Sequence, residues 1–246
     1  MFGLLVGSFL NAWAYRRPRD ISIARGRSFC PACSAPIHWF DNVPLLSFVV
    51  LRGRCRACGA RISWRYPAGE AATAALFALA AAITGLAWAL PLQLLFIAVL
   101  VLTTQMDLEF HEVPGDVLMA GAIIGLAGMI ALHPARWWVF VAAAGGAACF
   151  LIVVRAAYKA IRGVTGMGIG DVSIALLLGA YLGAAVLPAM FLGFLLGAVV
   201  GVAVMARKGG TMKTALPFGP FLAAGGIAML FAGEPIIRAY LHLLSH

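Results

Sequence analysis

Apolar residues gather in eight runs along the chain, and the breaks between the runs carry proline or charged residues. An untilted helix needs about 20 residues to cross a bilayer. Several runs are shorter than this, so we expect the helix ends to differ from the run ends by several residues. The pattern predicts eight membrane helices, near residues 2–15, 71–90, 92–106, 117–132, 138–154, 172–187, 189–206 and 215–233.

One long polar segment, residues 16–66, separates the first apolar run from the second and contains ten arginines. The pattern therefore predicts a transmembrane helix at 1–15, a soluble domain at 16–66 and a seven-helix membrane domain at 67–246. Basic residues favour the cytosolic side of a membrane. With the soluble domain in the cytosol, sixteen of the eighteen Lys and Arg residues lie on that side. This arrangement predicts that both termini lie outside.

The composition supports an all-α polytopic membrane protein. The chain is 63% hydrophobic and 11% charged, with a mean hydropathy of +0.98, whereas soluble domains are about half apolar and about a quarter charged. The net charge of +9 is concentrated in one soluble segment, so it does not indicate a nucleic-acid-binding surface. The first run has basic residues behind it and none ahead of it, which is opposite to a cleaved signal peptide. The expected partner is the lipid bilayer and not nucleic acid.

Four cysteines in the soluble segment form two pairs, CPAC and CRAC, each with two residues between its cysteines. This spacing is typical of a structural zinc site, in which two short loops supply four thiolates to one ion. A segment of this size with few large apolar residues gains folding energy from such an ion. Two disulfides and a redox-active pair are the alternatives, and a cytosolic location disfavours disulfides. The predicted ligands are Cys30, Cys33, Cys55 and Cys58.

Two aspartates are expected at the same depth of the membrane. Asp107 ends the third apolar run and Asp171 begins the sixth, and the alternation of helices brings both to the cytosolic face. Two carboxylates in one site share a proton, because both cannot ionise cheaply. The ionised one can accept a proton from water, and the protonated one can hydrogen-bond a scissile carbonyl, as in aspartic proteases. The alternative is that Asp171 only caps the sixth helix.

Three glycines precede Asp171 in the stretch GMGIGD, namely Gly166, Gly168 and Gly170. Glycine permits backbone conformations and close approaches that a Cβ atom would prevent. An extended substrate, or the helix that ends at Asp107, is therefore expected to lie against this loop. Asp171 would stand near a helix N-terminus, where the helix dipole favours a negative charge.

Together these motifs closely resemble the type IV prepilin peptidases, bacterial inner-membrane aspartic proteases of the GxGD class. The resemblance covers nearly the whole chain and includes GSFLNAWAYRRP (7–18), the cysteine-containing stretch 30–70, DLEFHEVPGD (107–116), GMGIGDVSIALLLGAYLG (166–183) and LPFGPFLAAGG (216–226). The family, which serves type IV pili and type II secretion, implies an endopeptidase that removes a short basic leader from prepilins or pseudopilins at the cytosolic membrane face. Many members then methylate the new N-terminus with S-adenosylmethionine.

The resemblance also assigns roles to individual residues. Asp107 and Asp171 match the two catalytic aspartates, and the four cysteines match the zinc-binding set. Gly53, in LRGRC, matches a glycine associated with methyl transfer.

Two positions depart from the family pattern. The family usually has Pro followed at once by Asp or Asn after the first aspartate, whereas here Gly115 separates Pro114 from Asp116. A lysine usually follows the GxGD aspartate by two residues, and here Ser173 stands in its place. Neither departure removes a catalytic carboxylate, but both change the charge and the geometry that surround it.

A basic leader would be repelled by the basic cytosolic surface, so its recognition is expected to depend on the few acidic residues near Asp107. The candidates are Glu109, Glu112 and Asp116. The alternative is a solvated acidic loop that has no role in recognition.

Three other functions compete with the bifunctional peptidase. The nearest is a peptidase without methyltransferase activity, because methyl-donor binding is implied by the resemblance alone. A proton- or ion-coupled transporter with a zinc-bearing cytosolic domain is the second, since intramembrane carboxylates often bind protons or cations. The ionisable groups cluster at one face, and no inverted repeat is visible, which disfavours this class. The third is a pilin-binding assembly factor without catalytic activity.

Overall fold

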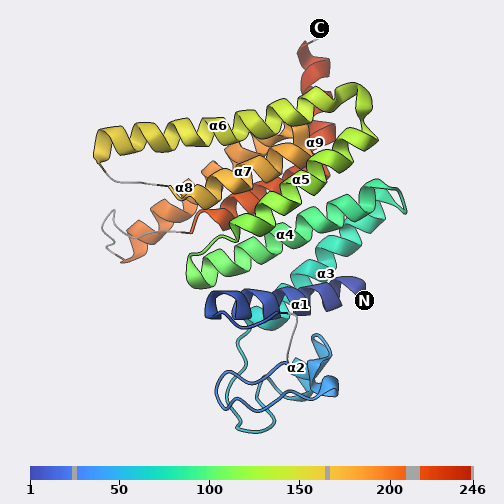
Figure 1. Ribbon diagram of the computed structural model, residues 1–246, viewed down its shortest axis with the longest axis vertical. Helices are drawn as coiled ribbons and strands as arrows, with labels where there is room; N and C mark the ends of the chain where they lie inside the picture. The colour runs from blue at the N-terminus through green and yellow to red at the C-terminus, as the bar shows by residue number, and fades with distance from the viewer. Residues whose placement is uncertain (24–26, 164–166, 209–216, 245–246) are drawn as a thin grey trace. The chain divides into compact units, whose positions relative to one another are not determined.

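The computed structural model of the chain describes residues 1–23, 27–163, 167–208 and 217–244. Over these residues the chain is helical, and its only strand-like pairings are two isolated β-bridges. Eight helices of at least 14 residues confirm the number predicted from the hydrophobic pattern. They are α1 (Phe2–Arg16), α3 (Arg65–Thr84), α4 (Ala89–Phe110), α5 (Gly115–Leu132), α6 (Trp137–Arg162), α7 (Ile169–Leu182), α8 (Val186–Lys208) and α9 (Gly219–Leu244) (Figure 1).

The described helices include five stretches that are long and apolar enough to cross a membrane. These are α3, α4, α5, the stretch 134–162 that contains α6, and the stretch 169–206 that contains α7 and α8. A short 3-10 turn, η4 (Gly183–Ala185), separates α7 from α8, and residues 219–233 of α9 form a shorter apolar helix. The chain is therefore a multi-pass membrane protein.

The helix boundaries differ from the predicted run ends around residue 85. The expected break at Pro91 is wrong, because α3 ends at Thr84 and α4 begins at Ala89. Gly85 terminates α3 with a φ of 65°, a conformation that glycine adopts at low cost. Pro91 lies within the first turn of α4. The N–H groups of a first turn have no acceptor within the helix, so the N–H that proline lacks is not needed there.

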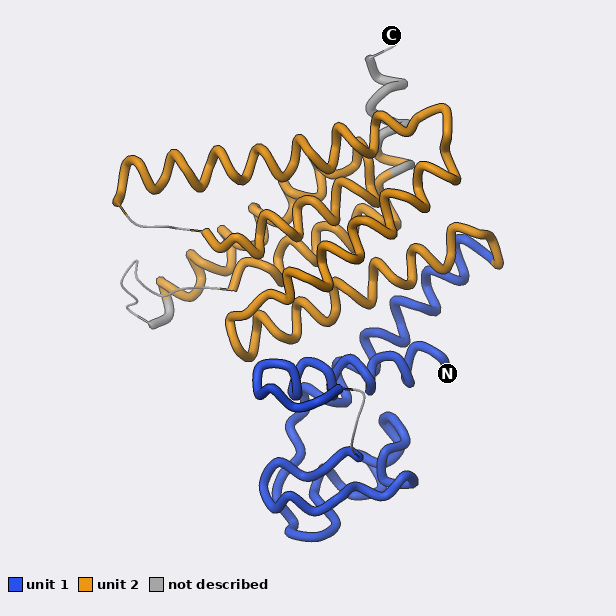
Figure 2. Tube along the Cα trace, viewed as in Figure 1, with its two compact units in different colours: residues 1–85 blue, residues 86–246 orange. Residues whose placement is uncertain are grey.

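The first compact unit, residues 1–85, contains α1, the polar segment with the short helix α2 (Leu46–Val50), and α3 (Figure 2). α1 and α3 pack at close range, because a Cβ on Gly3 or Gly7 would lie 2.8 Å from a backbone Cα atom of α3. Small residues permit this kind of membrane-helix contact. A hydrogen bond connects the polar segment to α3: the N–H of Leu45 donates to Oε2 of buried Glu70 at 2.8 Å.

The second compact unit, residues 86–246, is organised around α7. This helix contacts α5, α6, α8 and α9, and it is buried on nearly all sides (Figure 1). A helix that is apolar all round is suited to such a central position. A Cβ on Gly179 would lie 2.5 Å from backbone atoms of Ala143 in α6, so the two helix backbones touch. This packing fixes α7, and with it the position of Asp171.

Candidate active site and metal centre

Asp107 lies in the last turn of α4, and its residue surface is 6% exposed. Its Oδ2 atom accepts a hydrogen bond from the N–H of Gly219 at 2.9 Å. Gly219 is the first residue of α9, where the first N–H groups have no partner within the helix. A Cβ on Gly219 would lie only 2.7 Å from Oδ2 of Asp107, so glycine is required for this contact. The N-terminus of α9 therefore holds one oxygen of Asp107.

Asp171 lies in the first turn of α7, with 7% of its surface exposed. Its Oδ2 atom accepts the N–H of Gly168 at 3.1 Å. Asp171 thus caps its helix, as the simpler of the two sequence interpretations expected. The cap occupies Oδ2 alone, and within the described residues Oδ1 of Asp171 and Oδ1 of Asp107 accept no hydrogen bond. Each carboxylate therefore retains an oxygen for other chemistry.

The structure brings Asp107 and Asp171 into one site. They are close enough for their charges to interact. A Cβ on Gly219 would touch both the Asp107 carboxylate and Cδ1 of Ile174, at 3.2 Å, and Ile174 lies one turn beyond Asp171. These contacts show that α4, α7 and α9 meet at the carboxylates. The two carboxylates therefore lie together, and their common depth in the membrane stays a prediction.

The loop that follows Asp107 packs directly on the GxGD motif. A Cβ on Gly170 would lie 2.5 Å from Cβ of Val113 and 2.8 Å from each of its γ-carbons. Gly168 is different, because the nearest atom to its Cβ position is Oδ2 of Asp171 at 3.6 Å. Its φ of −72° is also open to any residue. Gly170 thus permits a close contact, whereas Gly168 contributes an N–H group. Gly166 lies outside the described residues.

Arg155 is a site residue that the sequence reasoning missed. It lies in α6, and its guanidinium donates to the carbonyl of Met167, inside the glycine-rich loop, at 2.6 Å. Met167 stands four residues before Asp171, so Arg155 holds the segment that leads into this carboxylate. In the sequence, Arg155 counted only as one of the basic residues that set the orientation. Its distance along the chain from Asp171 gave no sign of the contact.

The three acidic residues near Asp107 are exposed. Glu109 lies in the last turn of α4, Glu112 lies in the following loop, and Asp116 lies in the first turn of α5. Gly115 begins α5, and no atom of the described residues lies within 4 Å of its Cβ position, so the inserted residue fits without a close contact. Ser173 is partly exposed in α7, and its hydroxyl lies 3.5 Å from the carbonyl of Ile169.

The four cysteines converge on one point, as their spacing predicted. The Sγ atoms of Cys30, Cys33, Cys55 and Cys58 all lie within 4.8 Å of one another. The two turns that carry them have the same backbone geometry. In each turn the first cysteine donates its N–H to an alanine carbonyl, Cys30 to Ala35 at 2.9 Å and Cys55 to Ala60 at 2.8 Å. The backbone thus forms two matching turns, and the cysteine sulfurs of both turns lie in one cluster.

This geometry fits a tetrahedral zinc ion. A Zn–S bond of about 2.3 Å places ligand sulfurs about 3.8 Å apart, and the Cys30 and Cys58 sulfurs are 4.0 Å apart. The N–H groups of Cys58 and Ala57 lower the pKa of Cys55 to about 7. They therefore favour the thiolate form of Cys55 that a metal binds, whereas the neighbouring Cys58 thiol raises the pKa of Cys33 to about 11. Cys149, the fifth cysteine, is exposed on α6 and outside this cluster.

Gly53 lies in a cavity of about 670 Å³ on the polar segment. Its φ is +66°, and its Cβ would lie 3.1 Å from the ring of Phe48, so glycine is required there for two reasons. The rings of Phe48 and Trp64 are 4.7 Å apart and both line the cavity. The basic residues of the lining are Arg52, Arg54 and Arg61.

The fold and the site together define a polytopic membrane protein with a buried aspartate pair and a four-cysteine centre. Comparison with known proteins narrows this class. Residues 1–84 match the bacterial peptidase A24 N-terminal domain, and residues 94–202 match the type IV leader peptidase family. The chain belongs to the type IV leader peptidase family and is a peptidase. No solved structure matches the chain.

The relatives are similar over almost their whole length. The chain is 32% identical to the prepilin leader peptidase/N-methyltransferase of Bacillus subtilis, over 99% of this chain and 96% of the relative. It is 36% identical to the enzyme of that name from Burkholderia pseudomallei, over 96% of this chain and 84% of the relative. It is 32% identical to the enzyme of that name from Neisseria gonorrhoeae, over 100% of this chain and 93% of the relative. This membership excludes the transporter and the non-catalytic assembly factor, and it supports placement in the inner membrane.

Proposed function

We propose that this peptidase is an aspartic endopeptidase that removes the basic leader from type IV prepilins or pseudopilins. It then methylates the new N-terminus with S-adenosylmethionine. The observation that carries the proteolytic part is the meeting of two buried carboxylates, Asp107 and Asp171, each with one oxygen held by a backbone N–H. The names of the relatives supply the substrate class and the second activity.

The two amide contacts suit the roles of an aspartic pair. The N–H groups of Gly219 and Gly168 each orient one carboxylate, so the unbonded oxygens are available for a water molecule and for the scissile carbonyl. One ionised aspartate takes a proton from the water, and the water oxygen attacks the carbonyl carbon. The protonated aspartate donates its hydrogen bond to the carbonyl oxygen and then supplies a proton to the leaving nitrogen.

The direction of the substrate follows from the topology that we propose. With the soluble segment in the cytosol and both termini outside, Asp107 and Asp171 lie at the cytosolic ends of α4 and α7. A substrate helix in the bilayer would reach them at the point where its basic leader emerges into the cytosol. Gly168 is exposed beside Asp171, while Gly170 is already in contact with Val113.

The exposed acidic residues beside Asp107 are proposed to attract the leader. Glu109, Glu112 and Asp116 flank the site on the exposed ends of α4 and α5, and opposite charges favour encounter with a basic peptide. Replacing all three with their amides is expected to raise KM and leave kcat unchanged. The same exchange at Asp20, which is exposed in the first unit, is the control. An unchanged KM in the triple variant would exclude this role.

The four-cysteine centre is proposed to hold a structural zinc ion. Four thiolates complete a tetrahedral shell and leave no position for a reacting water. The ion would instead stabilise the two matching turns of the polar segment. These turns lie in a region where few large side chains are buried.

The cavity at Gly53 is the proposed site of the methyl donor. Its volume of about 670 Å³ admits a nucleoside-sized ligand, and its residues match two parts of S-adenosylmethionine. The adenine ring would stack on Phe48 or Trp64, and the carboxylate would pair with an arginine of the lining. When bound, the donor supplies an electrophilic methyl group.

The donor site can be tested with two glycines of the same conformation. Gly53 and Gly59 have φ values of +66° and +71°, so alanine strains the backbone equally at both. Gly53 lines the cavity, whereas nothing lies within 4 Å of the Cβ position of Gly59. We expect Gly53→Ala to abolish binding of S-adenosylmethionine in a calorimetric titration and Gly59→Ala to retain it. Equal affinities in the two variants would place the donor elsewhere.

Mass spectrometry of a prepilin incubated with the purified protein tests the whole proposal. Loss of the leader together with the gain of one methyl group is the expected result when the donor is added. Leader loss without methylation would establish a peptidase alone, and an unprocessed prepilin would reject the proposed substrate class.

A further inference from the structure

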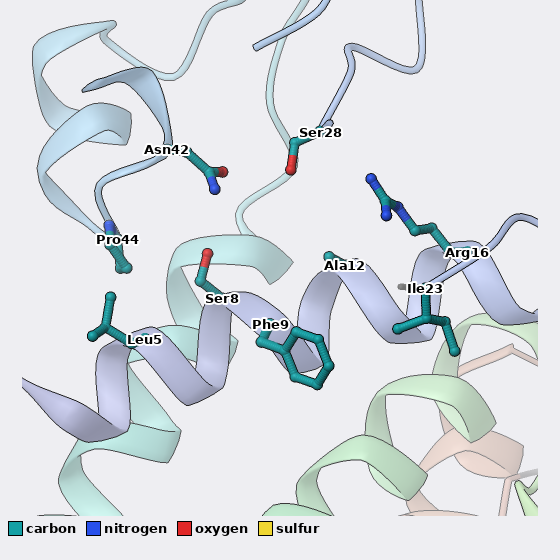
Figure 3. Close-up of a pocket in the computed structure, with 9 residues that line it drawn as sticks. All are labelled: Leu5, Ser8, Phe9, Ala12, Arg16, Ile23, Ser28, Asn42 and Pro44. Carbon is teal, nitrogen blue, oxygen red and sulfur yellow. The ribbon is translucent and has the colours of Figure 1, made fainter. Parts of the chain in front are cut away.

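A second cavity runs along one face of α1 in the first unit (Figure 3). Its volume is about 250 Å³. Leu5, Phe9 and Ala12 of α1 line its apolar part (Figure 3). The face of α1 that carries Gly3 and Gly7 packs on α3, so the cavity lies on the opposite side of the helix. This cavity plays no part in the chemistry proposed above.

Four polar side chains turn toward this cavity. The hydroxyl groups of Ser8 and Ser28 and the amide of Asn42 face one space, and the guanidinium of Arg16 extends toward it from the end of α1 (Figure 3). Within the described chain, the side chains of Ser8, Ser28 and Asn42 form no hydrogen bond. They come from three different segments, which converge only because the chain folds back over α1. These side chains are half-buried or exposed, so their hydrogen-bonding groups are accessible to a ligand that enters the cavity.

Arg16 is buried without a negative partner. It is 7% exposed, and its Nη1 and Nη2 atoms donate to the carbonyls of Ser22 at 3.2 Å and Arg27 at 2.9 Å. These carbonyls satisfy two of the five N–H donors of a guanidinium, but they carry no formal charge. No carboxylate in the described part of the chain pairs with Arg16. A buried charge is costly unless an opposite charge accompanies it.

We propose that this cavity binds a phosphate group, with Arg16 supplying the charge and Ser8, Ser28 and Asn42 supplying hydrogen bonds. Phosphate fits better than carboxylate for a geometric reason. A carboxylate has two oxygen atoms, and pairing with arginine through two parallel hydrogen bonds uses both of them, whereas Ser8, Ser28 and Asn42 offer further donors in the same cavity. A tetrahedral phosphate instead accepts single hydrogen bonds from several sides, which is how these donors are placed around the cavity (Figure 3).

The apolar part of the lining adds a second property to the ligand. Leu5, Phe9 and Ala12 continue the cavity along α1, away from Arg16, and Leu5 and Phe9 are exposed, so an apolar extension of a phosphate compound would contact these side chains. A phospholipid headgroup and a soluble phosphate share the chemistry that Arg16 recognises. They differ in whether the apolar residues are used, and the experiment below separates them.

The test uses the full-length protein purified in a maltoside detergent without phosphate. Unfolding temperatures are measured with inorganic phosphate, with phosphatidylglycerol, and with chloride at the same ionic strength. Native mass spectrometry then counts the retained phospholipid. Stabilisation by inorganic phosphate assigns the site to a soluble ligand. Stabilisation by phospholipid alone, with one molecule retained, assigns it to a headgroup, and the absence of both effects overturns the proposal.

Two variants keep the test independent of Arg16, whose loss would also release the carbonyls of Ser22 and Arg27. The double variant Ser8→Ala, Ser28→Ala removes two donors and is expected to weaken phosphate or lipid binding at least tenfold, because hydrogen bonds to a charged group are stronger than those between neutral groups. Ser173→Ala, in the other unit, is the matched control and should bind normally. Unweakened binding in the double variant would contradict the assignment.

Ser28→Asp provides the opposite test. It places a carboxylate in the cavity beside Arg16, so it should raise the unfolding temperature in the phosphate-free detergent and abolish the effect of added phosphate or lipid. If Ser28→Asp destabilises the protein while the ligand effect persists, Arg16 needs no counter-charge and the proposal fails. Neither result depends on peptidase activity.

Discussion

Alanine at Gly170 should separate the GxGD motif from the loop that follows Asp107. The added Cβ would lie 2.5 Å from Cβ of Val113, and ordinary contacts begin at 3.4 Å, so the two segments must move apart by about 1 Å. Val113 cannot yield by rotating its side chain, because its Cβ is fixed to the backbone. Since a misplacement of 1 Å in an active site costs roughly 100-fold in rate, we expect Gly170→Ala to lower kcat by about this factor.

Gly168→Ala is the matched control within the same motif. Its Cβ has room, at 3.6 Å from the nearest atom, and its backbone conformation suits alanine. We therefore expect kcat within about threefold of wild type. The assay is single-turnover cleavage of a prepilin in detergent, with the unfolding temperature measured for each variant. Val113→Gly removes all the clashing atoms and should restore part of the activity of Gly170→Ala. Equal losses at Gly168 and Gly170 would refute the steric argument.

Three other predictions follow from charges and ligands. Metal analysis should find one zinc ion per chain, and Cys55→Ser should lose it and lower the unfolding temperature. Arg155→Met should reduce cleavage roughly tenfold or more, because hydrogen bonds to charged groups contribute about 1.5–3 kcal/mol. Arg155→Lys should retain part of the activity. Arg162→Met, on the exposed end of α6, is the control and should retain all of it. Arg56 donates hydrogen bonds to Asp41 and lowers its pKa. The pair therefore stabilises the fold above the unfolded pKa of about 3.9 and loses this effect as the pH falls through the folded value. Asp41→Asn should then lower the unfolding temperature at neutral pH but not at a pH below the lowered pKa of Asp41.

Local patterns predicted the parts of the site that depend on spacing. The two CxxC pairs met in one cluster because each turn presents its sulfurs to the same side. The helix number followed from the apolar runs, and counting those runs predicted that Asp107 and Asp171 lie at the same end of their helices. The one misplaced break, at Pro91, arose because proline is tolerated in a first helical turn as well as between helices.

Contacts between distant segments could not be predicted in this way. Nothing in the sequence links Asp107 to Gly219, because the N–H that bonds the carboxylate is a backbone group at a helix start. Gly170 was expected to allow a close approach, but only the packing of α4, α5 and α7 identifies Val113 as the neighbour. Arg155 reaches the motif from another helix, and periodicity carries no information about such a pairing.

The central claim is that Asp107 and Asp171 act as one catalytic unit. The most direct test measures single-turnover prepilin cleavage by Asp107→Asn, by Asp171→Asn and by the double variant, with unfolding temperatures as a control. Residues that act together show strongly non-additive losses. We predict that each single variant loses cleavage almost completely and that the double variant loses no more. Substantial cleavage by either single variant, in a protein that remains folded, would contradict the two-aspartate mechanism.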